Sequence, residues 1–216
     1  MKRFTFLIVI VLMIANETEA KKIEGKVLFK NDTLDVIFKI PINIFSKEIN
    51  FEKLQYKIKY IDSAKNTVVI KSNQAEEIRF LYQDEEVRML SRYTNDRLEN
   101  VFSNNYKIFL KLEIDGKIKL FKYYQTESSP VMYNSSSDLI TEGISYQVDK
   151  CFLQKDSQEL IRIKGLTFRK DMMEYFSDCH DVFQKIENKE YRKKDIETIV
   201  NYYNSYCINR EFMRTN

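Results

Sequence analysis

The chain has 216 residues and a formal net charge of +3, with 31% charged residues, 13% aromatic residues, only four glycines and two prolines. This composition is typical of an ordered globular protein and excludes a disordered or linker-rich chain. The small net charge by itself predicts no acidic partner.

Residues 1–20 predict a signal peptide. Lys2 and Arg3 precede an apolar run over residues 6–15. That run is roughly half of the ~20 residues that a membrane-spanning helix needs, and it has the length expected of a signal peptide. An uncleaved membrane anchor is the alternative.

Cleavage is expected between Ala20 and Lys21, because Ala20 is a small residue that ends the polar stretch after the apolar run. The mature chain, residues 21–216, has the size of one domain with a sizeable core. No cysteine precedes Cys151, so no residue near the cleavage point can carry a bacterial lipid. We therefore expect a secreted or periplasmic protein of the cell envelope, without a transmembrane span once the signal peptide is removed.

The β-rich part, residues 21–124, alternates apolar and polar residues in short runs. Such alternation is typical of antiparallel strands with one solvated face. Asn31 and Asp32 predict the turn of a first hairpin, and Asp115-Gly116 predicts the turn of a later one.

Lysines also alternate along these predicted strands, at Lys57 and Lys59 and again at Lys117 and Lys119. Interleaved with aromatic residues, they are similar to the pattern of a nucleic-acid-binding surface. Alternating lysines are nevertheless expected on the solvated face of an antiparallel strand, where they also discourage edge-to-edge pairing. We therefore expect no nucleic-acid partner.

The remaining segments continue the same domain. Residues 125–143 predict a polar loop, and residues 144–164 predict a β-hairpin. Residues 167–207 carry apolar side chains three or four positions apart, which predicts a hairpin of two amphipathic helices, and residues 208–216 are a tail. We expect a single α+β domain, in which the helical hairpin packs on an antiparallel sheet that is curled or forms a partial barrel.

Three cysteines, Cys151, Cys179 and Cys207, predict one disulfide and one unpaired thiol in an exported protein. Cys179 and Cys207 are the favoured pair, because a bridge between them would clamp the two predicted helices together. One objection is that Cys207 lies about six residues, or roughly 9 Å, farther from the connection than Cys179 does. A bond through Cys151, or three unpaired thiols, is the alternative.

No pattern predicts a catalytic, metal-binding or cofactor-binding residue. His180 follows Cys179, but adjacent residues on a helix do not face the same ion, so we expect His180 on the helix surface. Carboxylates are concentrated at two places, Asp84 to Glu86 and the pair Asp178 and Asp181. The four glycines form neither a nucleophile elbow nor a phosphate loop.

Several short motifs stand out in the second half of the chain. They are Gly116-Lys117-Ile118 with Leu120, Phe152-Leu153-Gln154-Lys155, Asp178-Cys179, Lys185-Ile186, Tyr191, Asp195-Ile196, Ile199-Val200, Tyr203-Asn204 and Cys207. In these motifs the chain resembles uncharacterised secreted proteins of the Bacteroidetes type, loosely over most of the mature chain and most closely near the C-terminus. The resemblance implies an envelope location and a structural role for Cys179 and Cys207, and it implies no catalytic residue.

The sequence therefore favours a non-catalytic binding or interaction module of the cell envelope. Its partner would be an unknown envelope protein or a small ligand, and no cofactor is expected. One alternative is an envelope hydrolase, which needs acidic side chains that converge in one cleft. The other is a carrier of a small apolar ligand, which needs a dry pocket in the concavity of the sheet.

Overall fold

The computed structural model describes residues 20–43, 46–94, 106–128, 132–134, 139–141 and 145–208. Residues 1–19, which make up nearly all of the predicted signal peptide, lie outside the described part of the chain. Residues 209–216 of the predicted tail also lie outside it.

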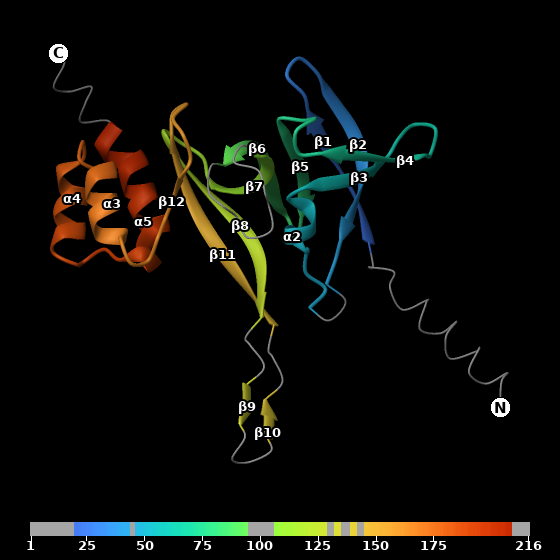
Figure 1. Ribbon diagram of the computed structural model, residues 1–216. Coiled ribbons are helices and arrows are strands. Elements are labelled where there is room, and N and C mark those ends of the chain that lie inside the picture. The colour runs from blue at the N-terminus through green and yellow to red at the C-terminus, as the bar shows by residue number, and fades with distance from the viewer. Residues whose placement is uncertain are drawn as a thin grey trace.

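One large antiparallel sheet dominates the fold (Figure 1). Its strands are β1 (Ala20–Leu28), β2 (Thr33–Pro41), β3 (Lys57–Ile61), β4 (Thr67–Lys71), β5 (Glu77–Tyr82), β6 (Glu85–Thr94), β7 (Tyr106–Ile114), β8 (Ile118–Ser128), β11 (Ser145–Lys155) and β12 (Ile161–Arg162). Their order across the sheet is β12-β11-β8-β7-β6-β5-β1-β2-β3-β4. The sheet is open, because β12 and β4 are its two edges. Strand β1 pairs with both β2 and β5, which places the first hairpin inside the sheet.

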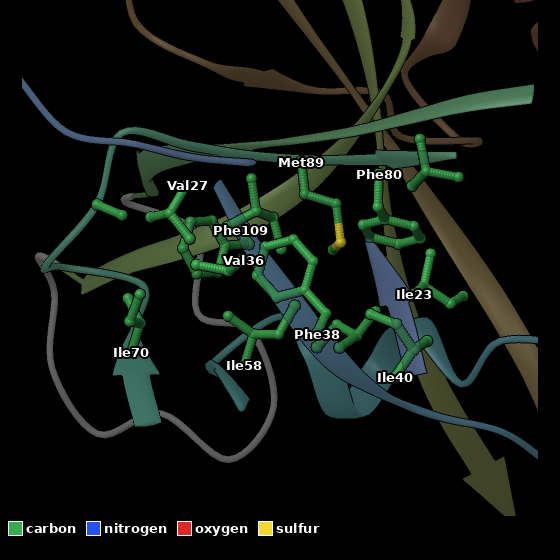
Figure 2. Close-up of a cluster of buried hydrophobic side chains, with 14 of the residues drawn as sticks. Ile23, Val27, Val36, Phe38, Ile40, Ile58, Ile70, Phe80, Met89 and Phe109 are labelled. Carbon is green, nitrogen blue, oxygen red and sulfur yellow. The ribbon is translucent and has the colours of Figure 1, made fainter. Parts of the chain in front are cut away.

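The half of the sheet that contains β1 to β7 curls around a core of its own. Phe38 and Ile58 from β2 and β3 meet Phe80 and Phe109 from β5 and β7 in one buried cluster (Figure 2). Each of these four side chains is almost fully removed from solvent. The predicted curl is therefore confirmed, whereas closure into a barrel does not occur.

Gln55 fills a gap between β7 and β8. These two strands pair only from Lys111 to Ile114 on β7. Gln55 directly follows the short helix α2 (Phe51–Leu54) and lies where the two strands separate. The buried Gln55 amide donates to the Tyr124 carbonyl at 2.8 Å and accepts from the Tyr124 N–H at 2.5 Å. Its own carbonyl accepts from the N–H of Phe109 at 2.8 Å. The side chain of Gln55 thus satisfies backbone groups of β8, and its backbone carbonyl satisfies one of β7.

The segment 125–143, which is expected to be a loop, contains regular structure. Strand β8 continues to Ser128, because its pairing with β11 extends that far. Two further strands, β9 (Met132–Asn134) and β10 (Leu139–Thr141), form a separate antiparallel pair that projects beyond β8 and β11 (Figure 1). Polar composition does not exclude strands here, because strands pair through main-chain groups that every residue except proline supplies in full.

The C-terminal helices pack on one face of β8 and β11, at the end of the sheet opposite β1 to β4 (Figure 1). They are α3 (Phe168–Tyr175), α4 (His180–Glu187), the 3-10 helix η1 (Lys193–Asp195), α5 (Ile196–Tyr202) and the π-helix η2 (Tyr203–Cys207). The first predicted helix is thus two short helices. The break contains Ser177 and Asp178, which favour side-chain hydrogen bonds over helix interiors. Here the Asp178 carboxylate accepts hydrogen bonds from Lys155 and Tyr203.

Candidate functional site

The disulfide between Cys179 and Cys207 is present, with 5.6 Å between the two Cα atoms. The expected 9 Å offset does not arise because Cys179 lies at the break before α4, and Cys207 lies in the π-helical last turn. The third cysteine, Cys151, is unpaired and half-buried, and its burial raises the pKa of the thiol. This bridge joins helices within their own core and has a structural role.

His180 is the first residue of α4, and its side chain is exposed, as the sequence predicts. Among the residues that the structure describes, no group of three or more histidine, cysteine, aspartate or glutamate side chains is placed to hold a metal ion.

The carboxylates noted in the sequence lie in separate places. Asp84 lies in the exposed turn between β5 and β6, where Gln83 and Asp84 both adopt positive φ, and Glu85 is the exposed first residue of β6. Asp178 is held by Lys155 and Tyr203, and Asp181 accepts a hydrogen bond from Tyr202 at 3.0 Å. Each of these carboxylates is therefore either exposed or already hydrogen-bonded to a neighbouring side chain.

A row of three lysines crosses the outer surface of the curled half of the sheet. Lys22 on β1 lies directly opposite Lys39 on β2, and Lys39 lies directly opposite Lys59 on β3. All three alternate with buried neighbours such as Ile23, Phe38 and Ile58, so their side chains point away from the core. We call Lys22, Lys39 and Lys59 the lysine row.

The lysine row places like charges next to one another without compensation. Neighbouring strands lie about 4.8 Å apart, and like charges directly opposite each other destabilise a sheet. None of the three has a carboxylate within ion-pair distance among the described residues; Lys39 instead donates to the hydroxyl of Thr67 at 2.8 Å. By contrast Lys26, on the same outer surface, pairs with Asp35 at 3.4 Å.

Protection of a sheet edge explains only part of the lysine row. Lys39 and Lys59 each have a paired strand on both sides, but β1 pairs with β5 only from Gly25 to Leu28, so Lys22 lies outside that pairing. The interpretation of alternating lysine as protection of a sheet edge therefore fits Lys22 on β1 and Lys71 on β4, but it does not fit Lys39 and Lys59.

A pocket of about 880 Å³ opens beside this row, between β2, β3 and α2. Four lysines contribute to its lining: Lys39, Lys53, Lys57 and Lys59. Thr67 and Tyr56 also line it, with hydroxyl groups that are hydrogen-bonded to Lys39 and Tyr123 respectively. Leu54 and Ile58 lie at its wall but are almost fully buried. The one carboxylate in the lining, that of Glu52, accepts a hydrogen bond from Thr126 at 2.6 Å. We call this cavity the lysine pocket.

The chemistry of the lysine row and the lysine pocket is that of anion binding. Ammonium groups attract phosphate, sulfate and carboxylate as point charges, and hydroxyl groups add directional hydrogen bonds. The lining contains no histidine and no cysteine. This composition is suited to holding a ligand.

Part of this site is visible in the sequence in hindsight. A hairpin closed at Asn31 and Asp32 fixes the register that sets Lys22 opposite Lys39. The pairing of Lys39 with Lys59 has no local signal, because α2 and its flanking segments separate the two strands.

Comparisons with known proteins do not indicate a function, so the inference of function depends on the geometry of the site. No family model, no curated protein and no solved structure matches the chain. Within the described residues, no helix combines the length and the apolar character needed to span a membrane.

Proposed function

We propose that the protein is a non-catalytic binding module of the cell envelope whose ligand is an anion. The lysine row carries this proposal. Three ammonium groups on adjacent strands lower the stability of the sheet, so an anion that neutralises them is bound with a gain in Coulomb energy. The lysine pocket adds a concave surface of mixed polar and apolar character, which is typical of ligand sites.

Export to the envelope is part of the same proposal. It is supported by the predicted signal peptide, by the resemblance to secreted proteins of the Bacteroidetes type, and by a disulfide of the kind that persists in oxidising compartments. Ala20 lines the lysine pocket. Cleavage before Lys21 would therefore leave a new α-amino group at the rim of that pocket and add one more positive charge.

The two alternatives have less support. The hydrolase requires converging carboxylates, and those singled out in the sequence lie in two separate regions, where they are already hydrogen-bonded or exposed. The apolar carrier requires a dry cavity. The concavity of the sheet is instead filled by the buried cluster that contains Phe38, Ile58, Phe80 and Phe109, which we call the first core cluster (Figure 2).

Isothermal titration calorimetry with inorganic tripolyphosphate tests the anion-binding function. We expect the unaltered protein to bind, with an affinity that falls as salt is added. The triple variant Lys22→Gln, Lys39→Gln, Lys59→Gln should bind at least about tenfold more weakly, because the Coulomb attraction of three ammonium groups is lost. Lys26→Gln is the matched control, since Lys26 is an exposed lysine of β1 that is neutralised by Asp35.

We expect Lys26→Gln to retain affinity within about twofold. The proposal is overturned by absence of binding to the unaltered protein, or by equal loss of affinity in the triple variant and in the Lys26 variant.

A further inference from the structure

The outer surface of β1 to β4 carries apolar side chains among its lysines. Ile37 precedes Lys39 by two residues on β2, and Val69 on β4 lies directly opposite Lys59. Both point to the same side as the lysine row, because successive residues of a strand alternate between the two faces. Ile37 is 40% exposed and Val69 is 44% exposed, which are high values for β-branched residues within a sheet.

The charges of this surface are strongly one-sided. Its outward positions hold Lys22, Lys26, Lys39, Lys57, Lys59 and Lys71, with Glu24 and Asp35 as the acidic residues. Asp35 is engaged by Lys26. A second like-charge pair, Lys57 opposite Lys71, adjoins the lysine row. We call this surface the outer face of β1 to β4.

Within the described part of the chain this face is accessible, and Lys22, Ile37 and Val69 are all exposed. The C-terminal helices cover the sheet at its other end, on β8 and β11 (Figure 1). The opposite side of β1 to β4 is occupied by the first core cluster, so the outer face is the side that remains for a partner.

A soluble anion would use the charges of this face but not its exposed isoleucine and valine. A membrane surface with anionic lipids uses both. Each lysine near such a surface is attracted to the headgroups, and lysine stems lie along apolar surface while their ammonium groups reach outward. Aliphatic side chains between the lysines then enter the boundary between headgroups and acyl chains.

We infer that the outer face of β1 to β4 docks on the surface of an anionic lipid bilayer. The lysine row contacts the lipid phosphates, and Ile37 and Val69 are buried in the interfacial region. This inference rests on the proposed anion-binding function and specifies the ligand as a lipid surface. The protein is held at the surface and does not enter the hydrocarbon core.

Co-sedimentation with lipid vesicles tests the inference. We expect binding to vesicles of equimolar phosphatidylcholine and phosphatidylglycerol, and little binding to vesicles of phosphatidylcholine alone. Each Lys→Gln substitution in the lysine row should weaken vesicle binding about fivefold. The double variant Ile37→Ser, Val69→Ser should weaken it at least about tenfold while leaving the affinity for tripolyphosphate unchanged. Leu166→Ser is the control for apolar removal, because Leu166 is fully exposed just before the C-terminal helices.

The outcomes separate the inference from the function on which it rests. Binding of tripolyphosphate without binding of anionic vesicles would overturn membrane docking and leave the anion-binding function in place. Vesicle binding that is unaffected by Ile37→Ser, Val69→Ser would overturn insertion of this face. Failure with both probes would overturn both.

Discussion

The side-chain amide of Asn204 takes the place of a neighbouring strand at Ile118. It accepts a hydrogen bond from the Ile118 N–H at 2.9 Å and donates one to the Ile118 carbonyl at 2.9 Å. This contact ties the last helical segment to the first residue of β8. Gly116 makes it possible: a Cβ atom there would lie 2.4 Å from the Asn204 Nδ2 atom. The glycine of the predicted Asp115-Gly116 turn is therefore needed for close approach, since its φ is not positive.

Replacement of Asn204 by alanine should lower the free energy of unfolding by about 2 kcal/mol, because the buried backbone groups of Ile118 lose both partners. Gly116→Ala should also destabilise, by displacing Asn204. The two changes should be less than additive, since each disrupts the same contact. Urea unfolding of the two single variants and the double variant measures this coupling, and full additivity would contradict the relationship.

Removal of the disulfide by Cys179→Ser, Cys207→Ser should lower the free energy of unfolding by about 3 to 4 kcal/mol, the loss expected for a loop closed over a separation of 28 residues. Cys151→Ser is the control, because Cys151 is unpaired. Peptide mapping of the oxidised protein should recover Cys179 bonded to Cys207. Recovery of Cys151 in the bonded peptide would contradict the pairing.

Glu77 should make the stability of the protein depend on pH. Burial raises the pKa of this carboxyl. Hydrogen bonds from Arg88 and Arg79 lower the pKa by more than burial raises it, so the pKa lies below the ordinary value. The Glu77 Oε1 atom lies 2.6 Å from the Nε atoms of both arginines. A carboxyl whose pKa is lowered in the folded state contributes stability above its unfolded pKa and loses that contribution as the pH falls through its folded pKa.

Glu77→Gln should therefore destabilise the protein at neutral pH, by about 2 kcal/mol, because two partly exposed guanidinium groups lose their carboxylate. The difference between the unaltered protein and the variant should shrink as the pH falls below the ordinary pKa of a glutamate and then through the lower pKa of Glu77 in the folded protein. Denaturant unfolding at several pH values measures it. A difference that does not change with pH would show that the ion pairs contribute no stability.

His180→Ala should leave the free energy of unfolding unchanged within about 0.5 kcal/mol, because the imidazole is exposed at the start of α4. Thermal or urea unfolding checks this. A loss beyond about 1 kcal/mol would mean that His180 makes a contact that its exposure does not indicate.

Local patterns predict much of this fold, and distant pairings do not follow from them. The alternation of Val36, Phe38 and Ile40 predicts one buried face, and all three side chains are buried. The two cysteines on amphipathic segments predict the disulfide that is present. The break near Asp178 depends on Lys155 and Tyr203, which lie far from it in sequence, so helical periodicity alone cannot reveal it.

The candidate site illustrates the same limit. Lys57 and Lys59 are visible in the sequence as an alternating pair, and a solvated strand face explains them when they are considered alone. Their significance depends on register, because only the pairing of β2 with β3 brings Lys39 opposite Lys59. Register between strands separated by a helix is fixed by which side chains are buried in the core, here Phe38 on β2 and Ile58 on β3.

The most direct measurement combines stability and binding in the double variant Lys22→Gln, Lys59→Gln, which retains Lys39 and its hydrogen bond to Thr67. If the lysine row serves ligand binding, removal of two of its charges relieves repulsion. We then expect urea unfolding at low ionic strength to show unchanged stability or a gain of a few tenths of a kcal/mol, roughly the size of a cross-strand charge pair. Calorimetry should show weaker binding of tripolyphosphate. A loss of stability together with unchanged binding would contradict the proposed function.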